Sequence, residues 1–167
     1  MSTNELWTLG IAAYAAIIST FVFGWDAYKW FDSGPKIRLT SSTGMRLIGG
    51  YQVDPNIYVS ATAVNLGDRA TTITNLGFLY YSSWFKAMMR RSRADQAFVI
   101  ATPSQVQSIP FRFEPGAQWM GLAEQDEQLE RMSRDGYLFV VLYHSHGGGG
   151  VRHRVAPIPA TTDTSDA

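Results

Sequence analysis

An uncharged run of apolar residues near the N-terminus constrains this chain most strongly. The run, Leu6–Trp25, contains no Asp, Glu, Lys, Arg or proline. As an α-helix it is roughly 30 Å long, which matches the hydrocarbon core of a bilayer. Trp7 stands near one end and Trp25 at the other, as aromatic side chains do at headgroup level. We therefore predict one transmembrane helix over residues 6–25, after a short N-terminal tail at 1–5.

A buried helix of a soluble protein and a cleaved signal peptide are the two alternatives to an anchor. Core helices of soluble proteins are usually shorter and carry polar residues. A signal peptide needs a positively charged start and a small-residue cleavage site. Residues 1–5 lack Lys and Arg, and the run ends in bulky side chains. We therefore expect an uncleaved anchor.

Charge on the two sides of the run predicts its orientation. The N-terminal side has no Lys or Arg, whereas Lys29, Lys36 and Arg38 follow the run. Because positive flanks stay inside, we expect the C-terminal domain in the cytoplasm and the N-terminus outside. The absence of cysteine fits a reducing compartment. The alternative is the reverse orientation, with an envelope-facing domain in a membrane assembly.

Small residues recur at every fourth position of the predicted membrane helix. They are Thr8, Ala12, Ala16, Thr20 and Gly24. Such a row lets another helix approach closely, which predicts a homo-oligomer or docking to a partner's helix. Ordinary alanine-rich composition of a membrane helix is the alternative explanation.

Beyond a connector at 26–35, the pattern of the chain changes to β-strands and turns. Ser33-Gly34-Pro35 stops any helix. From there to residue 158, short β-prone stretches alternate with turn signals about every ten residues, as in a sandwich or barrel. The predicted strands are 36–40, 45–48, 56–64, 71–81, 97–101, 109–113, 137–145 and 151–156.

The predicted fold is therefore all-β: an immunoglobulin-like antiparallel β-sandwich at 36–158 with one short peripheral helix, preceded by the single transmembrane helix. The peripheral helix is expected at 122–134, on the rim of the sandwich, because Asp135-Gly136 closes an acidic, proline-free stretch. Residues 159–167 read as a flexible tail.

One turn adds a resemblance at the level of the fold. Asn65-Leu-Gly-Asp-Arg69, followed by Thr72-Ile73, resembles the strand, Asn-x-Gly turn and strand of many immunoglobulin-like modules. The Cys…Trp…Cys spacing of antibody domains is absent. The resemblance implies a fold only, because such folds host many unrelated functions.

All histidines of the chain fall in one short stretch, at His144, His146 and His153. If Gly147–Gly150 formed a four-residue hairpin loop, His144 would lie opposite His153 and the three imidazoles would be neighbours. Three imidazoles can hold Zn²⁺ or Cu²⁺, which raises the hypothesis of a metal-binding sensor or metalloenzyme. A solvated hairpin tip is the alternative, since a register slip of one residue turns His153 to the other face.

A basic loop between two predicted strands is a candidate contact surface. It can touch anionic headgroups, an acidic partner or nucleic acid, or it can be a solvated hairpin end. The residues assigned to membrane or partner contact are Trp84, Phe85, Lys86, Arg90, Arg91 and Arg93.

Composition and missing motifs exclude several classes of function. Fourteen basic residues balance 14 acidic residues, so no nucleic-acid binding is expected. Without cysteine, disulfide scaffolds and thiolate sites are excluded. Signatures of hydrolases, zinc proteases and nucleotide-binding loops are absent, so we predict no enzyme and no cofactor. The leading hypothesis is a membrane-anchored module that acts by protein or membrane-surface contact.

Overall fold

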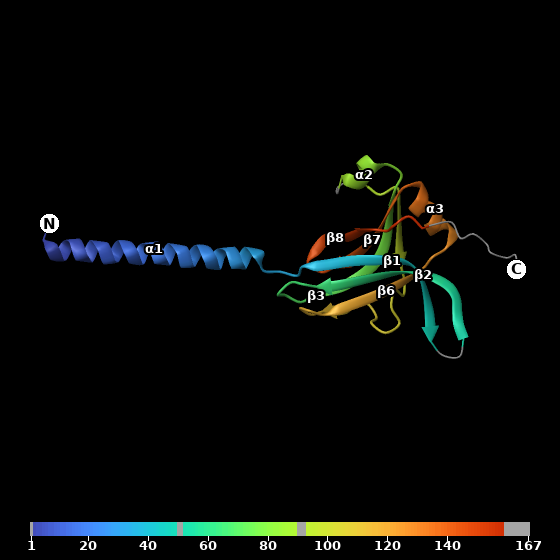
Figure 1. The fold of residues 1–167 in the computed structure, drawn as a ribbon, viewed down its shortest axis with the longest axis horizontal. Coiled ribbons are helices and arrows are strands. Elements are labelled where there is room, and N and C mark those ends of the chain that lie inside the picture. The colour runs from blue at the N-terminus through green and yellow to red at the C-terminus, as the bar shows by residue number, and fades with distance from the viewer. Residues whose placement is uncertain (1, 50–51, 90–92, 159–167) are drawn as a thin grey trace. The chain divides into compact units, whose positions relative to one another are not determined.

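The computed structural model describes residues 2–49, 52–89 and 93–158, and Figure 1 traces the chain from blue to red. The chain divides into a helical unit, Met1–Gly34, and a β-rich unit, Pro35–Ala167. The division falls between a glycine and a proline, and proline disfavours helical backbone in the residue before it. This confirms the expected change from helix to β structure.

The helical unit consists of α1, Thr3–Asp32. At its start, the Glu5 carboxylate accepts a hydrogen bond from the Ser2 backbone N–H at 2.8 Å. Ser33 caps the other end in an extended conformation. The helix is long and apolar enough to cross a membrane, and none of its residues is buried by the described part of the chain. It contains the predicted span at 6–25 and most of the predicted connector.

The β-rich unit contains two antiparallel sheets (Figure 1). The three-stranded sheet has the order β1-β2-β6, with β1 Ile37–Gly49, β2 Gln52–Asn65 and β6 Gln118–Glu124. The five-stranded sheet has the order β4-β3-β7-β8, and β5 pairs with the start of β3. Its strands are β3 Thr71–Tyr81, β4 Gln96–Ile100, β5 Phe111–Phe113, β7 Tyr137–His144 and β8 Gly147–Arg154.

The core joins the facing sides of the two sheets, as the alternation of side chains along each strand requires. Its largest fully buried side chain is Trp119 of β6. The indole N–H donates to the carbonyl of Gln107 at 2.9 Å, so burial leaves no polar atom of this ring unsatisfied. Other core residues are Val59, Ala61, Ala63, Ile73, Leu76, Phe78, Leu138, Val140 and Leu142.

The predicted peripheral helix begins later than expected. Residues Gln118–Glu124 form strand β6 because they pair with β2. Helix α3, Glu127–Asp135, starts where the Asp126 carboxylate accepts a hydrogen bond from the Leu129 N–H at 2.7 Å. Leu129 and Met132 pack into the core, whereas most other residues of this helix are exposed or half-buried.

Strands β1 and β2 continue beyond the sandwich as a two-stranded extension, which we call the distal hairpin (residues 45–57). β6 pairs with β2 only over Tyr58–Val64, so the residues beyond pair with each other alone. Two register shifts interrupt this part of the ladder, between Ser42 and Met45 and between Arg46 and Ile48. Such irregularities bend a hairpin, and Figure 1 shows the two strands curving away from the sheet.

The open edge of β6 is covered by the loop before β5. The Gln107 side-chain amide donates to the carbonyl of Gln118 at 3.1 Å, and its oxygen accepts from the Met120 N–H at 3.0 Å. Further along, the Leu122 N–H donates to the carbonyl of Pro103 at 2.6 Å. Three backbone groups of this edge are therefore bonded within the chain.

Candidate functional site

The histidine-bearing hairpin has a different register from the one predicted. The turn is Ser145-His146, because His144 pairs with Gly147 at the end of the ladder. His153 lies opposite Val140 rather than opposite His144. The predicted register is wrong because the four glycines belong to β8 instead of forming the loop. Among the described residues, no three His, Cys, Asp or Glu side chains come close enough to hold a metal ion.

Two of the three histidines meet at the start of β3. The Thr71 hydroxyl lies 3.0 Å from His146 Nδ1 and 3.4 Å from His144 Nδ1. The Ser145 hydroxyl joins them, 3.2 Å from His146 Nδ1 and 3.2 Å from the Thr71 hydroxyl. Burial, and then the neighbouring charge of His146, lowers the pKa of His144. The surroundings therefore favour the neutral form of the His144 imidazole beside the Thr71 hydroxyl.

The predicted basic loop contains a short helix, α2, Trp84–Met88. Trp84 and Phe85 are both more than half exposed. Lys86 Nζ donates to Asp95 at 2.6 Å, and this bond, together with two from Ser82, holds the pKa of Asp95 well below its usual value. The positive charge of Lys86 is thus balanced by Asp95. Arg93 is exposed. Two predicted contact residues, Arg90 and Arg91, lie outside the described residues.

The row of small residues on α1 is exposed along its whole length. Two of its hydroxyl groups bond to the helix itself: Thr8 to the Asn4 carbonyl at 2.9 Å and Thr20 to the Ala16 carbonyl at 2.8 Å. The row therefore presents small, internally satisfied side chains, which permit close packing of a second helix.

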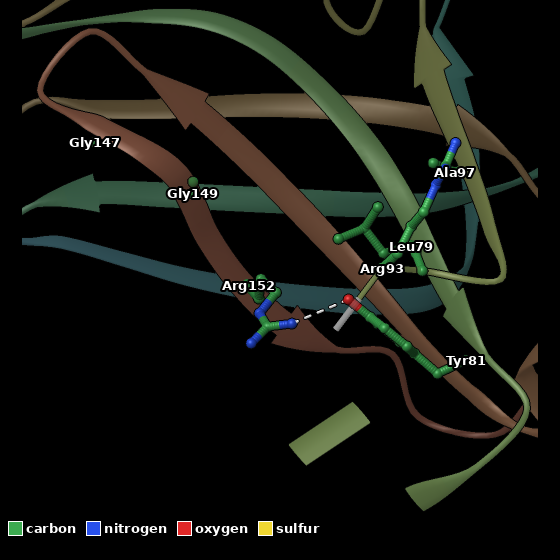
Figure 2. Close-up of a pocket in the computed structure, with 9 residues that line it drawn as sticks. Leu79, Tyr81, Arg93, Ala97, Gly147, Gly149 and Arg152 are labelled. Atoms are coloured by element: carbon green, nitrogen blue, oxygen red, sulfur yellow. Dashed lines mark hydrogen bonds between the residues drawn. The ribbon is translucent and has the colours of Figure 1, made fainter. Parts of the chain in front are cut away.

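A cavity of about 520 Å³ opens on the outer face of the five-stranded sheet (Figure 2). Its polar groups come from distant parts of the chain: Arg152 of β8, Tyr81 at the end of β3 and Arg93 before β4. Arg152 Nη1 donates to the Tyr81 hydroxyl at 3.2 Å, the bond drawn in Figure 2. Of these residues, the sequence predicts only Arg93 as a contact residue, and it gives no signal for the cavity itself.

Glycines form one wall of this cavity through an irregular stretch of β8. Between the pairs Leu142–Val151 and His144–Gly147, the single residue Tyr143 faces Gly148–Gly150. Such a bulge leaves backbone groups outside the ladder. Gly150 has a φ of +63°, and a Cβ there would lie 2.9 Å from a Val141 methyl carbon. Glycine at this position therefore satisfies both the backbone conformation and the packing.

An apolar groove of about 360 Å³ lies between the distal hairpin and the loop that covers β6. Leu47 and Tyr58 line one side, Val106 lines another, and Met120 and Leu122 are also part of the lining. The Tyr58 hydroxyl donates to Asp54 at 2.7 Å, which lowers the pKa of Asp54 and raises that of Tyr58. We call this site the apolar groove.

Comparisons with known proteins identify no family. No family model matches the chain, and no curated protein matches it. Among solved structures, it has a likeness to the one titled "X-ray structure of Northeast Structural Genomics Consortium target SoR45". The two are 8% identical with a TM-score of 0.34, over 81% of this chain and 96% of that chain.

Proposed function

We propose that this chain is a single-pass membrane protein whose β-rich unit acts by binding a partner protein, without catalysis. The observation that carries the proposal is the apolar surface around the groove. Three apolar side chains that line the groove are exposed: Val106 at 93%, Met120 at 45% and Leu47 at 41%. Apolar surface gathered on one side of a domain is typical of protein-binding sites.

The absence of catalysis rests on the chemistry of the polar cluster at Thr71. Its hydroxyl groups bond to imidazoles, as a nucleophile bonds to its base, but a third group that orients the base is required. Within the described residues, no hydrogen bond joins either imidazole to a carboxylate. A structural role in closing the β7–β8 hairpin accounts for these contacts.

For the fold, we propose an immunoglobulin-like arrangement. The orders β1-β2-β6 and β4-β3-β7-β8 correspond to strands A-B-E and C′-C-F-G of such domains. The chain passes from one sheet to the other between β2 and β3 and again between β6 and β7, as immunoglobulin chains do between B and C and between E and F. Trp119 stands on the strand corresponding to E, whereas antibody domains carry their core tryptophan on C.

For the anchor, we propose that α1 spans the membrane with the β-rich unit in the cytoplasm. Its apolar side chains lack protein cover, and Lys29, Lys36 and Arg38 lie on its C-terminal side. We test this with alkaline phosphatase or a fluorescent protein fused after Ala167. We expect inactive phosphatase, a fluorescent fusion, and retention in the membrane after alkaline carbonate extraction. Active phosphatase would reverse the orientation, and release by carbonate would remove the anchor.

Binding of a partner is tested by placing a photo-crosslinking amino acid at Val106 in the cell of origin. We expect a crosslinked band of defined mass that depends on irradiation. The matched control is Val99 on β4, which is 70% exposed but belongs to the other sheet. Equal crosslinking from both positions, or none from Val106, contradicts the proposal.

A further inference from the structure

We propose that the cavity on the outer face of the five-stranded sheet binds an organic phosphate, with Arg152 holding the phosphoryl group and Arg93 adding positive charge to the lining. The inference does not depend on the proposed partner protein, since the apolar groove is lined by other residues. The lining carries positive charge, because among the residues that the structure describes it contains two arginines and no acidic side chain.

Four basic side chains in the described part of the chain, those of Lys86, Arg112, Arg131 and Arg134, pair with carboxylates. Lys86 bonds to Asp95, and two further pairs, Arg131–Glu127 and Arg134–Glu130, lie along α3. No such pair is formed by Arg93 or Arg152 within the described residues. Because the Arg152 side chain is partly buried, a counter-charge is more favourable there than at a fully exposed position. An anionic ligand would supply it.

Contacts within the chain already position Arg152 for this role. Its guanidinium lies 5.7 Å from the centre of the Phe139 ring and donates one hydrogen bond to the Tyr81 hydroxyl. Tyr81 is itself 1% exposed and packs edge-to-face on Phe139 at 5.9 Å. A guanidinium held in this way loses little freedom when it binds the oxygens of a phosphoryl group. The Tyr81 hydroxyl accepts from Arg152 and keeps its own proton to donate.

The remaining walls suit the rest of such a ligand. The bulge at Gly148–Gly150 leaves backbone N–H groups outside the ladder, and exposed backbone N–H groups are favourable partners for an anion. A Cβ at Gly149 would meet no atom within 4 Å, so bare backbone borders the open space. Leu79 and Ala97 add apolar surface. The volume, about 520 Å³, is in the usual range for a small-molecule site.

The chemistry fits two sources of the phosphoryl group, a soluble phosphate monoester and the headgroup of an anionic lipid. The probe is phenyl phosphate, titrated by calorimetry into the full chain in a non-ionic detergent. We expect saturable binding of one probe per chain. For Arg152→Gln we expect binding about tenfold weaker or worse, because a charge-assisted pair is lost. Arg93→Gln is expected to weaken it severalfold.

Two further variants distinguish loss of a binding group from loss of folding or of overall charge. Arg46→Gln removes the same charge from the distal hairpin and should leave binding unchanged. Tyr81→Phe keeps the buried ring and removes only the hydroxyl, and binding should weaken while the circular dichroism spectrum stays the same. Absence of saturable binding, or equal weakening by Arg46→Gln, overturns the proposal.

Nanodiscs separate the two sources. The same titration is made in phosphatidylcholine discs and in discs that contain phosphatidylglycerol. If phenyl phosphate binding is lost in the phosphatidylglycerol discs, and is lost equally for the wild-type chain and for Arg46→Gln, the lipid headgroup is the ligand. Equal affinity in both discs identifies a soluble phosphate. Both results require that the Arg152→Gln chain binds more weakly in phosphatidylcholine.

Discussion

Helix α1 and strand β7 are both strongly apolar, but they differ in what covers them. No residue of α1 is buried, whereas Leu138, Val140, Val141 and Leu142 of β7 are at most 1% exposed. The strand lies between β3 and β8, with the core on one face. The difference shows that an apolar segment must be shielded from water, but that its composition does not determine what shields it. The rest of this chain shields β7, and we propose that lipid shields α1.

The largest expected effect tests the covered side of this comparison. Val140→Asp places an unpaired carboxylate at a position that is 0% exposed, and we expect a loss of about 4 kcal/mol in the free energy of unfolding. Domains are stable by only about 5–15 kcal/mol, so much of the protein should unfold. Urea unfolding followed by circular dichroism measures it. Val99→Asp, on exposed β4, should change stability by less than about 0.5 kcal/mol.

The same change on α1 tests the other side. Ile17→Asp should leave the urea midpoint of the β-rich unit unchanged, because Ile17 is 68% exposed. A carboxylate near the centre of a span costs about 3 kcal/mol on insertion, so less protein should remain in the membrane after carbonate extraction. Ile17→Leu is the control. Lower stability of the β-rich unit with normal membrane retention would mean that α1 is covered by protein instead.

Glycines sharpen the comparison at a smaller scale. A Cβ on Gly121 of β6 would lie 2.5 Å from Trp119 Cη2 and 2.9 Å from Leu76 Cδ2. We expect Gly121→Ala to lower the free energy of unfolding by about 2 kcal/mol through overpacking. Thermal unfolding of both proteins in the same detergent measures the loss. Gly149→Ala meets open space and serves as control; an equal loss there would mean that overpacking is not the cause.

On α1, substitution of glycine tests whether a second helix packs on the row of small residues. Gly24 has no neighbour within 4 Å, so Gly24→Leu should not affect the fold of one chain. If the small-residue row mediates association, the dimer in detergent should weaken about tenfold, which sedimentation equilibrium detects. Gly10 lies off the row, and Gly10→Leu should leave the dimer intact. A monomeric wild-type chain, or equal weakening by both variants, contradicts association through the row.

The smallest expected effect concerns His144, the last residue of β7. Burial lowers the pKa of His144 in the folded state relative to its ordinary value of 6.5. The unfolded chain therefore binds a proton first as the pH falls below about 6.5, and stability decreases with it. The melting temperature should fall between about pH 6.5 and 5, and His144→Gln should reduce this slope.

Elements whose own residues agree with their surroundings were predictable from the sequence. Strand β3 was predicted with its observed bounds, because Thr71-Thr-Ile-Thr at its start and Phe78-Leu-Tyr-Tyr at its end are β-prone. The end of α1 at Ser33 followed from the glycine and proline that come next.

Elements that depend on distant partners were not predictable. Leu122, Ala123 and Glu124 favour a helix by their own propensity, yet they pair with Ser60, Val59 and Tyr58 in a sheet. Tertiary pairing decided their conformation. In the same way, four successive glycines suggest a loop, but the strand continues through them. The cavity on the five-stranded sheet combines Arg93 with Arg152, and only the order of strands in the sheet brings them into one lining.

The bonds from Gln107 to β6 have a consequence for crowded molecules. A strand at the border of a sheet attracts any extended chain that can continue the ladder, and in a membrane many copies would face one another at high local density. Here one glutamine side chain occupies a donor and an acceptor that a neighbour would need. At this position of β6, the amide of Gln107 therefore takes the place that the backbone of a second chain would need.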